Sequence, residues 1–228
     1  TRFAAFLGKT LIYMWWVETG LKVPTERLIE KAKQASASLV HIPVLEVESL
    51  NPTVDISSFE AAFVGSPRAA KYAVELLKTF TGNLFAVGQG TQDALKKLGF
   101  ESKTFASDNN DGAYAFLTSL SSENDGKIPY SQIAWISAEE TAADLSFLTE
   151  LFKVKIVQIP VYRTFPSEKA EKKLLALESP KIIIVRSGKV AKAILNVVTQ
   201  EDSIVAYGTS TKKALNEFEI SYIDGDSW

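Results

Sequence analysis

Short runs of Val, Ile, Leu and aromatic residues alternate along the chain with longer segments whose apolar residues recur three and four positions apart. The short runs predict strands, and the longer segments predict helices with one buried face. We expect strands near Leu11–Trp15, Leu39–Ile42, Ala61–Val64, Leu84–Val87, Lys103–Phe105, Ile133–Ile136, Lys155–Ile159, Lys181–Val185, Ile204–Tyr207 and Ser221–Ile223. Helices are predicted at Pro24–Ala37, Pro67–Thr79, Thr91–Leu98, Gly112–Leu120, Thr141–Phe152, Glu168–Leu177, Lys189–Val198 and Lys212–Glu217. This alternation is typical of an α/β protein with parallel sheets and helices on both faces.

Part of the sequence is duplicated. Ile42-Pro43-Val44 returns as Ile159-Pro160-Val161, and Gly88-Gln89-Gly90-Thr91 returns as Gly208-Thr209-Ser210-Thr211. Each copy follows the first by about 120 residues, which is the size of one small α/β domain. We therefore predict two similar lobes, each a five-stranded parallel sheet flanked by helices, joined by a two-stranded linker.

The two Ile-Pro-Val segments predict where the chain crosses between the lobes. Each follows a predicted strand, and proline is disfavoured in the middle of a sheet because it donates no backbone hydrogen bond. With crossings at 43–45 and 161–164, residues 46–160 form one continuous domain and residues 1–42 with 165–228 form the other. A chain divided near Ser121–Pro129 is the alternative, and the duplication alone does not decide between them.

Composition narrows the possible functions. The net charge is −2, cysteine is absent and His41 is the single histidine. These facts argue against whole-molecule attraction to nucleic acid or membrane, and against disulfides, cysteine zinc sites and thiol nucleophiles. The longest apolar stretch, Thr10–Val17, is too short to span a bilayer, and Phe3–Leu7 lacks the features of a signal peptide. We expect a cytoplasmic protein without metal or cofactor.

Two glycine turns lead from predicted strands into predicted helices, at Gly88–Thr91 and Gly208–Thr211. A turn of this kind exposes backbone N–H groups at a helix N-terminus, where they attract carboxylate or phosphate. Thr91 and Thr211 either cap their helices or face a ligand. The absence of a third glycine in the dinucleotide spacing, and of a Gly-Lys-Ser/Thr motif, argues against a nucleotide site.

Two serine turns follow other predicted strands, and each has a cation two residues later. Ser66 precedes Pro67 and Arg68, and Ser187 precedes Gly188 and Lys189. In the structural interpretation, each serine is the N-cap of a helix, and Pro67 occupies the first helical position after Ser66. The functional interpretation is that all four turns meet at the carboxyl ends of the sheets, where open α/β sheets bind ligands.

This order of motifs resembles the uroporphyrinogen III synthase family, whose enzymes close linear hydroxymethylbilane into a macrocycle with inversion of ring D. The resemblance rests on Phe63–Arg68, Gly88–Leu95, Leu98–Phe100, Ser187, Gly208–Leu215 and the crossings Ile42–Glu48 and Val161–Thr164. Two positions depart from the family. Trp15–Thr19 stands where the family usually has Thr-Arg-Pro, so no ligand residue is assigned there, and Gly188 stands where proline is common.

The resemblance implies a site built for positioning, which suits a chain with one histidine and no cysteine. Tyr162 is the implied catalytic residue, facing the cleft near the departing hydroxyl, and a packing role at the hinge is its alternative. The implied substrate-binding residues are Ser66, Arg68, Gly88, Gln89, Thr91, Arg163, Ser187, Gly188, Lys189, Gly208, Ser210 and Thr211. Lys212 is expected to add positive charge for the carboxylates of the substrate, with Arg68, Arg163 and Lys189.

The predicted function is therefore cyclising dehydration of hydroxymethylbilane by a monomeric enzyme that binds neither nucleic acid nor membrane. The alternative is a non-catalytic bilobal protein that binds a small anion or a tetrapyrrole, because two α/β lobes with two crossings also suit a binding protein. His41 is expected to pack at the first crossing rather than to act in catalysis.

Overall fold

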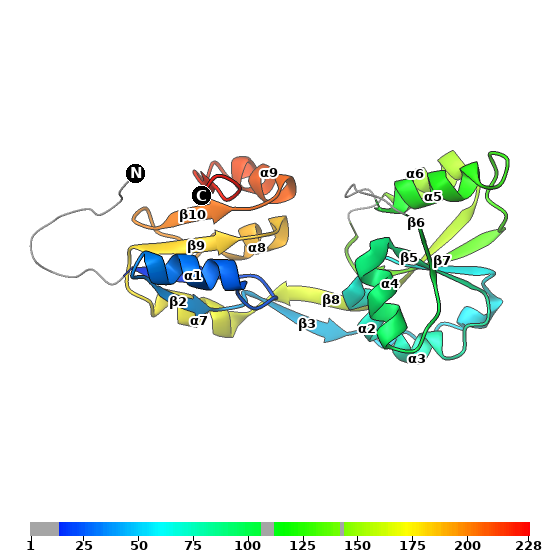
Figure 1. The fold of residues 1–228 in the computed structure, drawn as a ribbon, viewed down its shortest axis with the longest axis horizontal. Coiled ribbons are helices and arrows are strands. Elements are labelled where there is room, and N and C mark those ends of the chain that lie inside the picture. Colours follow the sequence, from blue (N-terminus) through cyan, green and yellow to red (C-terminus); the bar gives the residue numbers. More distant parts are fainter. Residues whose placement is uncertain (1–13, 106–111, 142–143) are drawn as a thin grey trace, which may run out of the picture. The chain divides into compact units, whose positions relative to one another are not determined.

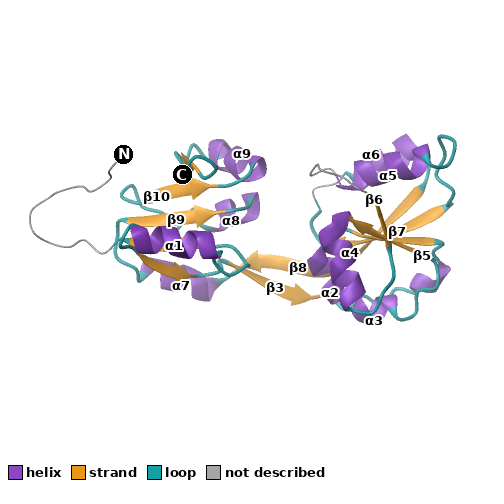
Figure 2. Ribbon diagram, viewed as in Figure 1, coloured by secondary structure: helices purple, strands orange, loops and turns teal. Residues whose placement is uncertain are grey.

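The structure, a computed structural model, describes residues 14–105, 112–141 and 144–228. The chain folds into two compact units. Unit 1 contains the described residues up to Glu46 together with Phe165–Trp228, and unit 2 contains Val47–Thr164. Figures 1 and 2 show the elements of each unit.

The sheet of unit 1 has five strands in the order β11-β10-β9-β1-β2. All its pairings are parallel. Counted along the chain within the unit, the order is 2-1-3-4-5, one of the common doubly wound arrangements. The strands are β1 (Trp15–Glu18), β2 (Ser38–His41), β9 (Lys181–Val185), β10 (Ser203–Ala206) and β11 (Ile223–Asp224). The helices are α1 (Glu26–Gln34), α7 (Glu168–Leu175), α8 (Gly188–Ala193) and α9 (Thr209–Glu217).

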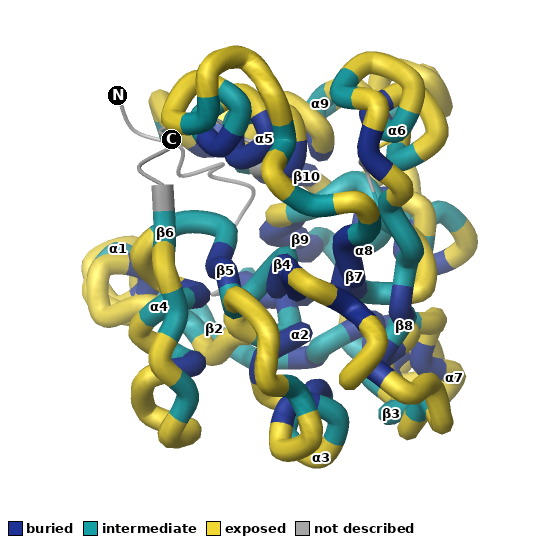
Figure 3. Tube along the Cα trace, turned by 90° about the vertical axis from the view of Figure 1, so that its right-hand side faces the viewer, coloured by how far each residue is buried: buried dark blue, intermediate teal, exposed yellow. Residues whose placement is uncertain are grey.

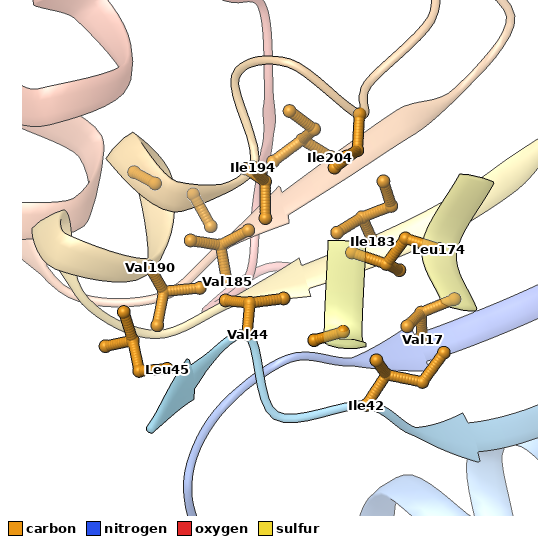
Figure 4. Packing of buried hydrophobic residues seen from close by; sticks show 14 of the residues in the cluster. Val17, Ile42, Val44, Leu45, Leu174, Ile183, Val185, Val190, Ile194 and Ile204 are labelled. Atoms are coloured by element: carbon orange, nitrogen blue, oxygen red, sulfur yellow. The ribbon is translucent and has the colours of Figure 1, made fainter. Parts of the chain in front are cut away.

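Alternating side chains of β9 build the two layers of core in unit 1. Ile183 and Val185 belong to a cluster with residues of α7, α8 and α9 (Figure 4). Ile184 belongs to a second cluster, with Leu28 of α1 on the opposite face. Successive side chains of a strand point to opposite faces, so a continuous apolar run serves a sheet covered on both sides.

The sheet of unit 2 has six strands in the order β3-β8-β7-β4-β5-β6. The pairings from β8 to β6 are parallel, and within that run the order is a 3-2-1-4-5 arrangement. The strands are β3 (Leu45–Ser49), β4 (Ala61–Val64), β5 (Asn83–Val87), β6 (Lys103–Phe105), β7 (Gln132–Ala138) and β8 (Lys155–Pro166). The helices are α2 (Pro67–Tyr72), α3 (Val74–Leu77), α4 (Gly88–Lys97), α5 (Gly112–Ser122) and α6 (Leu145–Phe152), with a short 3-10 helix at Ile56–Ser58.

Helices also cover both faces of the sheet in unit 2. Ala62 and Val64 pack in a cluster with residues of α2, α3 and α4, whereas Phe63 packs with residues of α5 and α6. Phe63 lies 4.1 Å from Phe116 and 4.3 Å from Trp135 between ring centroids. Burial is concentrated on the central strands β4 and β7, dark blue in Figure 3.

The predicted α/β class with helices on both faces of parallel sheets is confirmed, but the strand count differs. The second sheet has six strands, not five, because the unpredicted β3 joins its edge. Two glutamates interrupt the five residues of β3, so the sequence shows no apolar run there. The first predicted strand is displaced: β1 begins at Trp15, and Leu11–Tyr13 lie outside the described residues.

Pro160 lies within the β7–β8 ladder, contrary to the expectation that proline would avoid the sheet. It pairs with Ser137, and the register shifts immediately afterwards, so that Ala138 pairs with Tyr162. A β-bulge of this kind accommodates a residue that cannot donate a backbone hydrogen bond. The prediction of one helix over Pro67–Thr79 is also wrong, because that segment divides into α2 and α3 at Ala73.

Candidate functional site

Each sheet has a switch point, where the connections that leave two neighbouring strands run to opposite sides of the sheet. In unit 1 it lies between β1 and β9, and in unit 2 between β4 and β7. Ligands of doubly wound proteins bind outside the carboxyl ends of strands at such a switch point. The serine turns predicted from the sequence follow one strand of each pair, β9 and β4.

The turns after β4 and β5 lie together in unit 2. The Ser66 hydroxyl accepts a hydrogen bond from the Ala69 N–H at 3.0 Å, so the N-cap interpretation is correct. A Cβ atom on Gly90 would lie 3.9 Å from Cγ of Pro67, which places the start of α4 beside the start of α2. A capping hydroxyl still has its own hydrogen to donate to a ligand.

Tyr162 lies close to this pair of turns. Its ring is buried, stacks on Tyr72 of α2 with 5.6 Å between centroids, and lies 5.8 Å from the guanidinium carbon of Arg68. Its phenol donates no hydrogen bond to another described residue. The packing interpretation is therefore correct for the ring, and the hydroxyl keeps its donor.

Gln158 of β8 ties down the end of β7 beside Tyr162. Its Nε2 donates to the Ser137 hydroxyl at 3.1 Å and to the Ala138 and Glu139 carbonyls at 2.9 and 3.0 Å. The Glu139 N–H in turn donates to the Tyr162 carbonyl at 2.9 Å. These bonds hold the Tyr162 backbone at the switch point of unit 2, and no motif in the sequence indicated them.

The corresponding turns of unit 1 also lie together. The Ser187 hydroxyl accepts a hydrogen bond from the Val190 N–H at 3.3 Å and caps α8. A Cβ atom on Gly188 would lie only 3.2 Å from the Ser210 carbonyl oxygen and 3.4 Å from Cβ of Ala214. Gly188 therefore has a packing role, because it lets α8 approach α9.

The two threonines of the glycine turns are not helix caps. α4 begins at Gly88 and α9 at Thr209, so Thr91 and Thr211 lie inside the helices and are buried. Gly88 and Gly208 have φ values of 66° and 80°, a backbone conformation that favours glycine. The Thr211 hydroxyl has no hydrogen-bond partner among the residues that the structure describes. The interpretation of Thr91 and Thr211 as helix caps is therefore wrong.

Several other predicted site residues are already engaged within their own unit. Gln89 donates to Asp93 at 2.8 Å along α4. Arg163 pairs with Glu48 at 2.6 Å, and this hydrogen bond and charge raise the pKa of Arg163.

Lys212 pairs with Asp224 at 2.8 Å and Asp226 at 3.0 Å, and these carboxylates raise the pKa of Lys212. Arg163 and Lys212, which were expected to add positive charge for the substrate, therefore each have an acidic partner within their own unit.

Sequence reasoning missed a charged cluster at the switch point of unit 1. Glu18, the last residue of β1, pairs with Arg186 at 2.9 Å, and the Arg186 guanidinium carbon lies 4.2 Å from the ring centroid of Tyr207. Burial raises the pKa of the Tyr207 phenol, against the opposing charge of Arg186. The signal in the sequence was Glu18, which ends the apolar stretch Thr10–Val17 within the segment that departs from the pattern of the resembled family.

His41 lies beside this cluster and its Nε2 is 2.8 Å from the Gly20 carbonyl oxygen. That contact agrees with the expected packing role. Within residues 14–105, 112–141 and 144–228, no group of three His, Asp or Glu side chains could hold a metal ion. No helix in this part of the chain is long and apolar enough to cross a bilayer.

Comparison with known proteins gives one consistent result. The family model described as uroporphyrinogen-III synthase HemD matches residues 26–223. The uroporphyrinogen-III synthetase structure from Helicobacter pylori 26695 is 16% identical with a TM-score of 0.66, and 92% of each chain is covered. A mutant uroporphyrinogen III synthase structure from the extremely thermophilic bacterium Thermus thermophilus is 14% identical with a TM-score of 0.56, over 92% of this chain and 90% of that one. No curated protein matches the sequence.

Proposed function

Since the chain belongs to the uroporphyrinogen-III synthase family, cyclising lyases of heme biosynthesis that act on hydroxymethylbilane, we propose how its residues bring about the reaction. The substrate carries many carboxylates and expels one hydroxyl before the ring closes through a spiro intermediate. Catalysis then depends chiefly on holding a flexible chain in one geometry. The residues of this protein suit that task, because helix starts and two capping serines supply hydrogen-bond donors at its strand ends.

The carboxylates bind at the paired turns of both units. Backbone N–H groups at the starts of α4 and α9 supply donors, and the two capping serines add hydroxyl hydrogens. Gly88, Gln89, Gly208 and Ser210 contribute through the backbone in this proposal. The remaining substrate-binding residues are Ser66, Arg68, Thr91, Arg163, Ser187, Gly188, Lys189 and Thr211.

Tyr162 assists departure of the hydroxyl. As the carbon–oxygen bond breaks, its electron pair goes to oxygen, and the phenol stabilises that oxygen by donating a hydrogen bond. The observation that carries this role is the placement of a buried tyrosine beside Arg68 and Tyr72, with no described residue accepting its proton. The ring is held by packing, so the donor keeps one position.

The two units act as two lobes, and the strands β3 and β8 form the linker between them in this proposal. Hydrogen bonds support a paired linker: Leu50 N–H donates to Val161 O at 3.1 Å, and Ser167 N–H donates to Val44 O at 2.9 Å. The proposal also takes the protein to be a cytoplasmic monomer that binds neither nucleic acid nor membrane. The net charge of −2 supports the last two points only, because it offers no attraction to an anionic partner.

The isomers of the product test the activity. Protein is mixed with freshly generated hydroxymethylbilane, and uroporphyrinogen I and III are separated after oxidation to porphyrins. We expect the type III isomer in excess, increasing with protein concentration. Type I alone, the product of spontaneous closure, would contradict the proposal and favour a binding protein. Heat-denatured protein is the control.

A further inference from the structure

The proposed reaction leaves the charged cluster of unit 1 without a role. Glu18, Arg186 and Tyr207 stand at the carboxyl ends of β1, β9 and β10, three adjacent parallel strands. The register pairs Glu18 with Ile184 and Ala206 with Val185, so these strands end at nearly the same level. The cluster therefore lies at the switch point, on the edge that also carries the Ser187 turn.

Glu18 is buried, and each of its two carboxylate oxygens accepts a hydrogen bond. Its side chain is 2% exposed, and its Oε1 accepts the Gly20 N–H at 3.1 Å while its Oε2 accepts Arg186 Nε at 2.9 Å. A Cβ atom on Gly20 would lie 3.0 Å from Oε1, so the glycine lets the backbone fold closely over the carboxylate. A buried charge is tolerated when it is paired and hydrogen-bonded in this way.

Arg186 is held on two sides and open on a third. Nε is bound to Glu18, and the face of the guanidinium lies against Tyr207, whose ring packs on the Gly225 backbone. The side chain remains 35% exposed. Its two Nη groups donate to none of the described residues. A planar fork of donors fixed in this manner matches a carboxylate in two parallel hydrogen bonds.

We propose that Arg186 binds one carboxylate of the tetrapyrrole, with Glu18 and Tyr207 as positioning residues that fix its guanidinium. This inference rests on the proposed function, because it takes the polycarboxylate substrate from there. Little side-chain freedom remains to be lost on binding, since the ion pair and the ring contact already restrict the arginine. Glu18 lies in Trp15–Thr19, the segment that departs from the family pattern and to which the sequence assigned no ligand residue, so this cluster gives that segment a part in substrate binding.

Two variants separate binding from folding. Arg186→Gln removes the cation but leaves Glu18 buried without its partner, which destabilises a fold. The double variant Glu18→Gln and Arg186→Gln removes both charges, and the amide oxygen at position 18 still accepts the Gly20 N–H. Lys192→Gln is the control, because it removes one exposed lysine from the same unit. Thermal melts establish which variants fold.

The measurements are KM and kcat for hydroxymethylbilane, and the Kd of uroporphyrinogen III. For the folded double variant we expect both KM and Kd to rise roughly 10-fold or more, as for one lost charge-assisted contact, with kcat changed less than about 2-fold. Arg186→Lys keeps the charge without the fork, so its values should lie between those of the parent and the double variant. Lys192→Gln should match the parent.

A folded double variant with unchanged KM and Kd would overturn the assignment of Arg186. An unmodified protein that binds uroporphyrinogen III but yields only type I product would overturn the proposed activity, while the Kd comparison still decides the role of Arg186. Absence of binding by the unmodified protein, together with type I product alone, would overturn both.

Discussion

At the carboxyl ends of its strands, unit 1 carries an ion pair between Glu18 and Arg186. At the carboxyl ends of its own strands, unit 2 carries the stacked rings of Tyr72 and Tyr162. Both edges have a serine cap followed by a helix, and a neighbouring helix that begins at a glycine turn. The strand orders differ, 2-1-3-4-5 in one unit and 3-2-1-4-5 in the other. The turns are therefore the shared feature, and the residues behind them set the chemistry.

This difference separates two tasks. A guanidinium fixed on a buried carboxylate can hold an anionic substituent through a reaction. A phenol in an aromatic setting can donate a hydrogen bond at neutral pH without changing its own charge, since its ordinary pKa is about 10. In the two proposals, unit 1 therefore holds a carboxylate of the substrate through Arg186, and unit 2 assists departure of the hydroxyl through Tyr162.

The largest expected difference between the units is in their ability to fold alone. Unit 2 is one continuous segment with two core clusters of its own, whereas β1 of unit 1 pairs with β9 from the far end of the chain. We expect residues 47–164 expressed alone to unfold cooperatively on heating, and residues 14–46 alone to show no transition. Circular dichroism melts provide the test. A non-cooperative fragment 47–164 would contradict the division of the chain into these domains.

The next effect concerns a buried ion pair found in unit 1. Lys181 and Asp202 lie 3.3 Å apart, with side chains 3% and 0% exposed. Burial by itself raises the pKa of Asp202, but N–H groups of Thr199 and Lys181 and the lysine charge outweigh it and hold this pKa below its ordinary value. Asp202→Asn should lower the free energy of unfolding at pH 7 by about 3–5 kcal/mol, because Lys181 keeps a buried charge.

The pH dependence follows from that direction. A lowered folded-state pKa contributes stability above the unfolded-state value, about 3.9, and loses it as the pH falls through the folded-state value. The gap between Asp202→Asn and the parent should therefore narrow below about pH 4 in urea titrations. Glu75→Gln in unit 2 is the control, since the pair Glu75 and Lys78 is exposed and should contribute less than about 1 kcal/mol. An unchanged gap at acid pH would contradict the account.

The Tyr162→Phe variant tests the catalytic half of the comparison. The ring and its stacking on Tyr72 remain while the hydrogen-bond donor is lost, so turnover should fall by up to about 100-fold with an unchanged melting temperature. The substrate already expels its hydroxyl readily, which keeps the effect at or below the low end of general-acid catalysis. Tyr114→Phe, on an exposed position of α5, is the matched control. Equal turnover of Tyr162→Phe and the parent would leave Tyr162 with packing alone.

The smallest effect distinguishes the duplicated threonines. Both threonines are buried. The Thr211 hydroxyl is a buried group without a hydrogen-bond partner among the described residues, whereas the Thr91 hydroxyl is not such a group. Thr211→Val should raise the free energy of unfolding by about 1 kcal/mol, because it removes an unsatisfied buried hydroxyl. Thr91→Val should show no such gain in the same urea titration. Turnover of either variant should fall less than that of Tyr162→Phe, and destabilisation by Thr211→Val would show that its hydroxyl has a partner.

Local signals predicted much of this structure. Ala61–Val64 and Lys181–Val185 are uninterrupted apolar runs, and the strands occupy those residues. Ser66 and Ser187 precede helices in the pattern of N-caps, and both cap their helices. These features depend on neighbours a few residues away, which is why a single sequence reveals them.

The features that were missed depend on partners far away in the chain. Glu18 is 168 residues from Arg186, and no local pattern shows that a glutamate will be buried against that arginine. The aspartates that neutralise Lys212 are nearer in the chain, but they belong to β11 and the turn after it, so only the packing of α9 beside β11 brings them to the lysine. The fold could be predicted from periodicity, but the charges of the site could not, since ion pairing is decided by three-dimensional packing.

The pairing of β1 with β9 also sets an order of events during synthesis. At about 5–20 residues per second, roughly 10–30 s pass between the emergence of β1 and that of its partner β9 from the ribosome. Through that interval the apolar side chains of Trp16 and Val17 have no finished sheet to enter, while all of unit 2 is made. An unpaired strand edge is prone to associate with other chains. β1 is thus made long before it is sheltered by β9, and the yield of this protein in a cell should depend on chaperones that hold nascent chains.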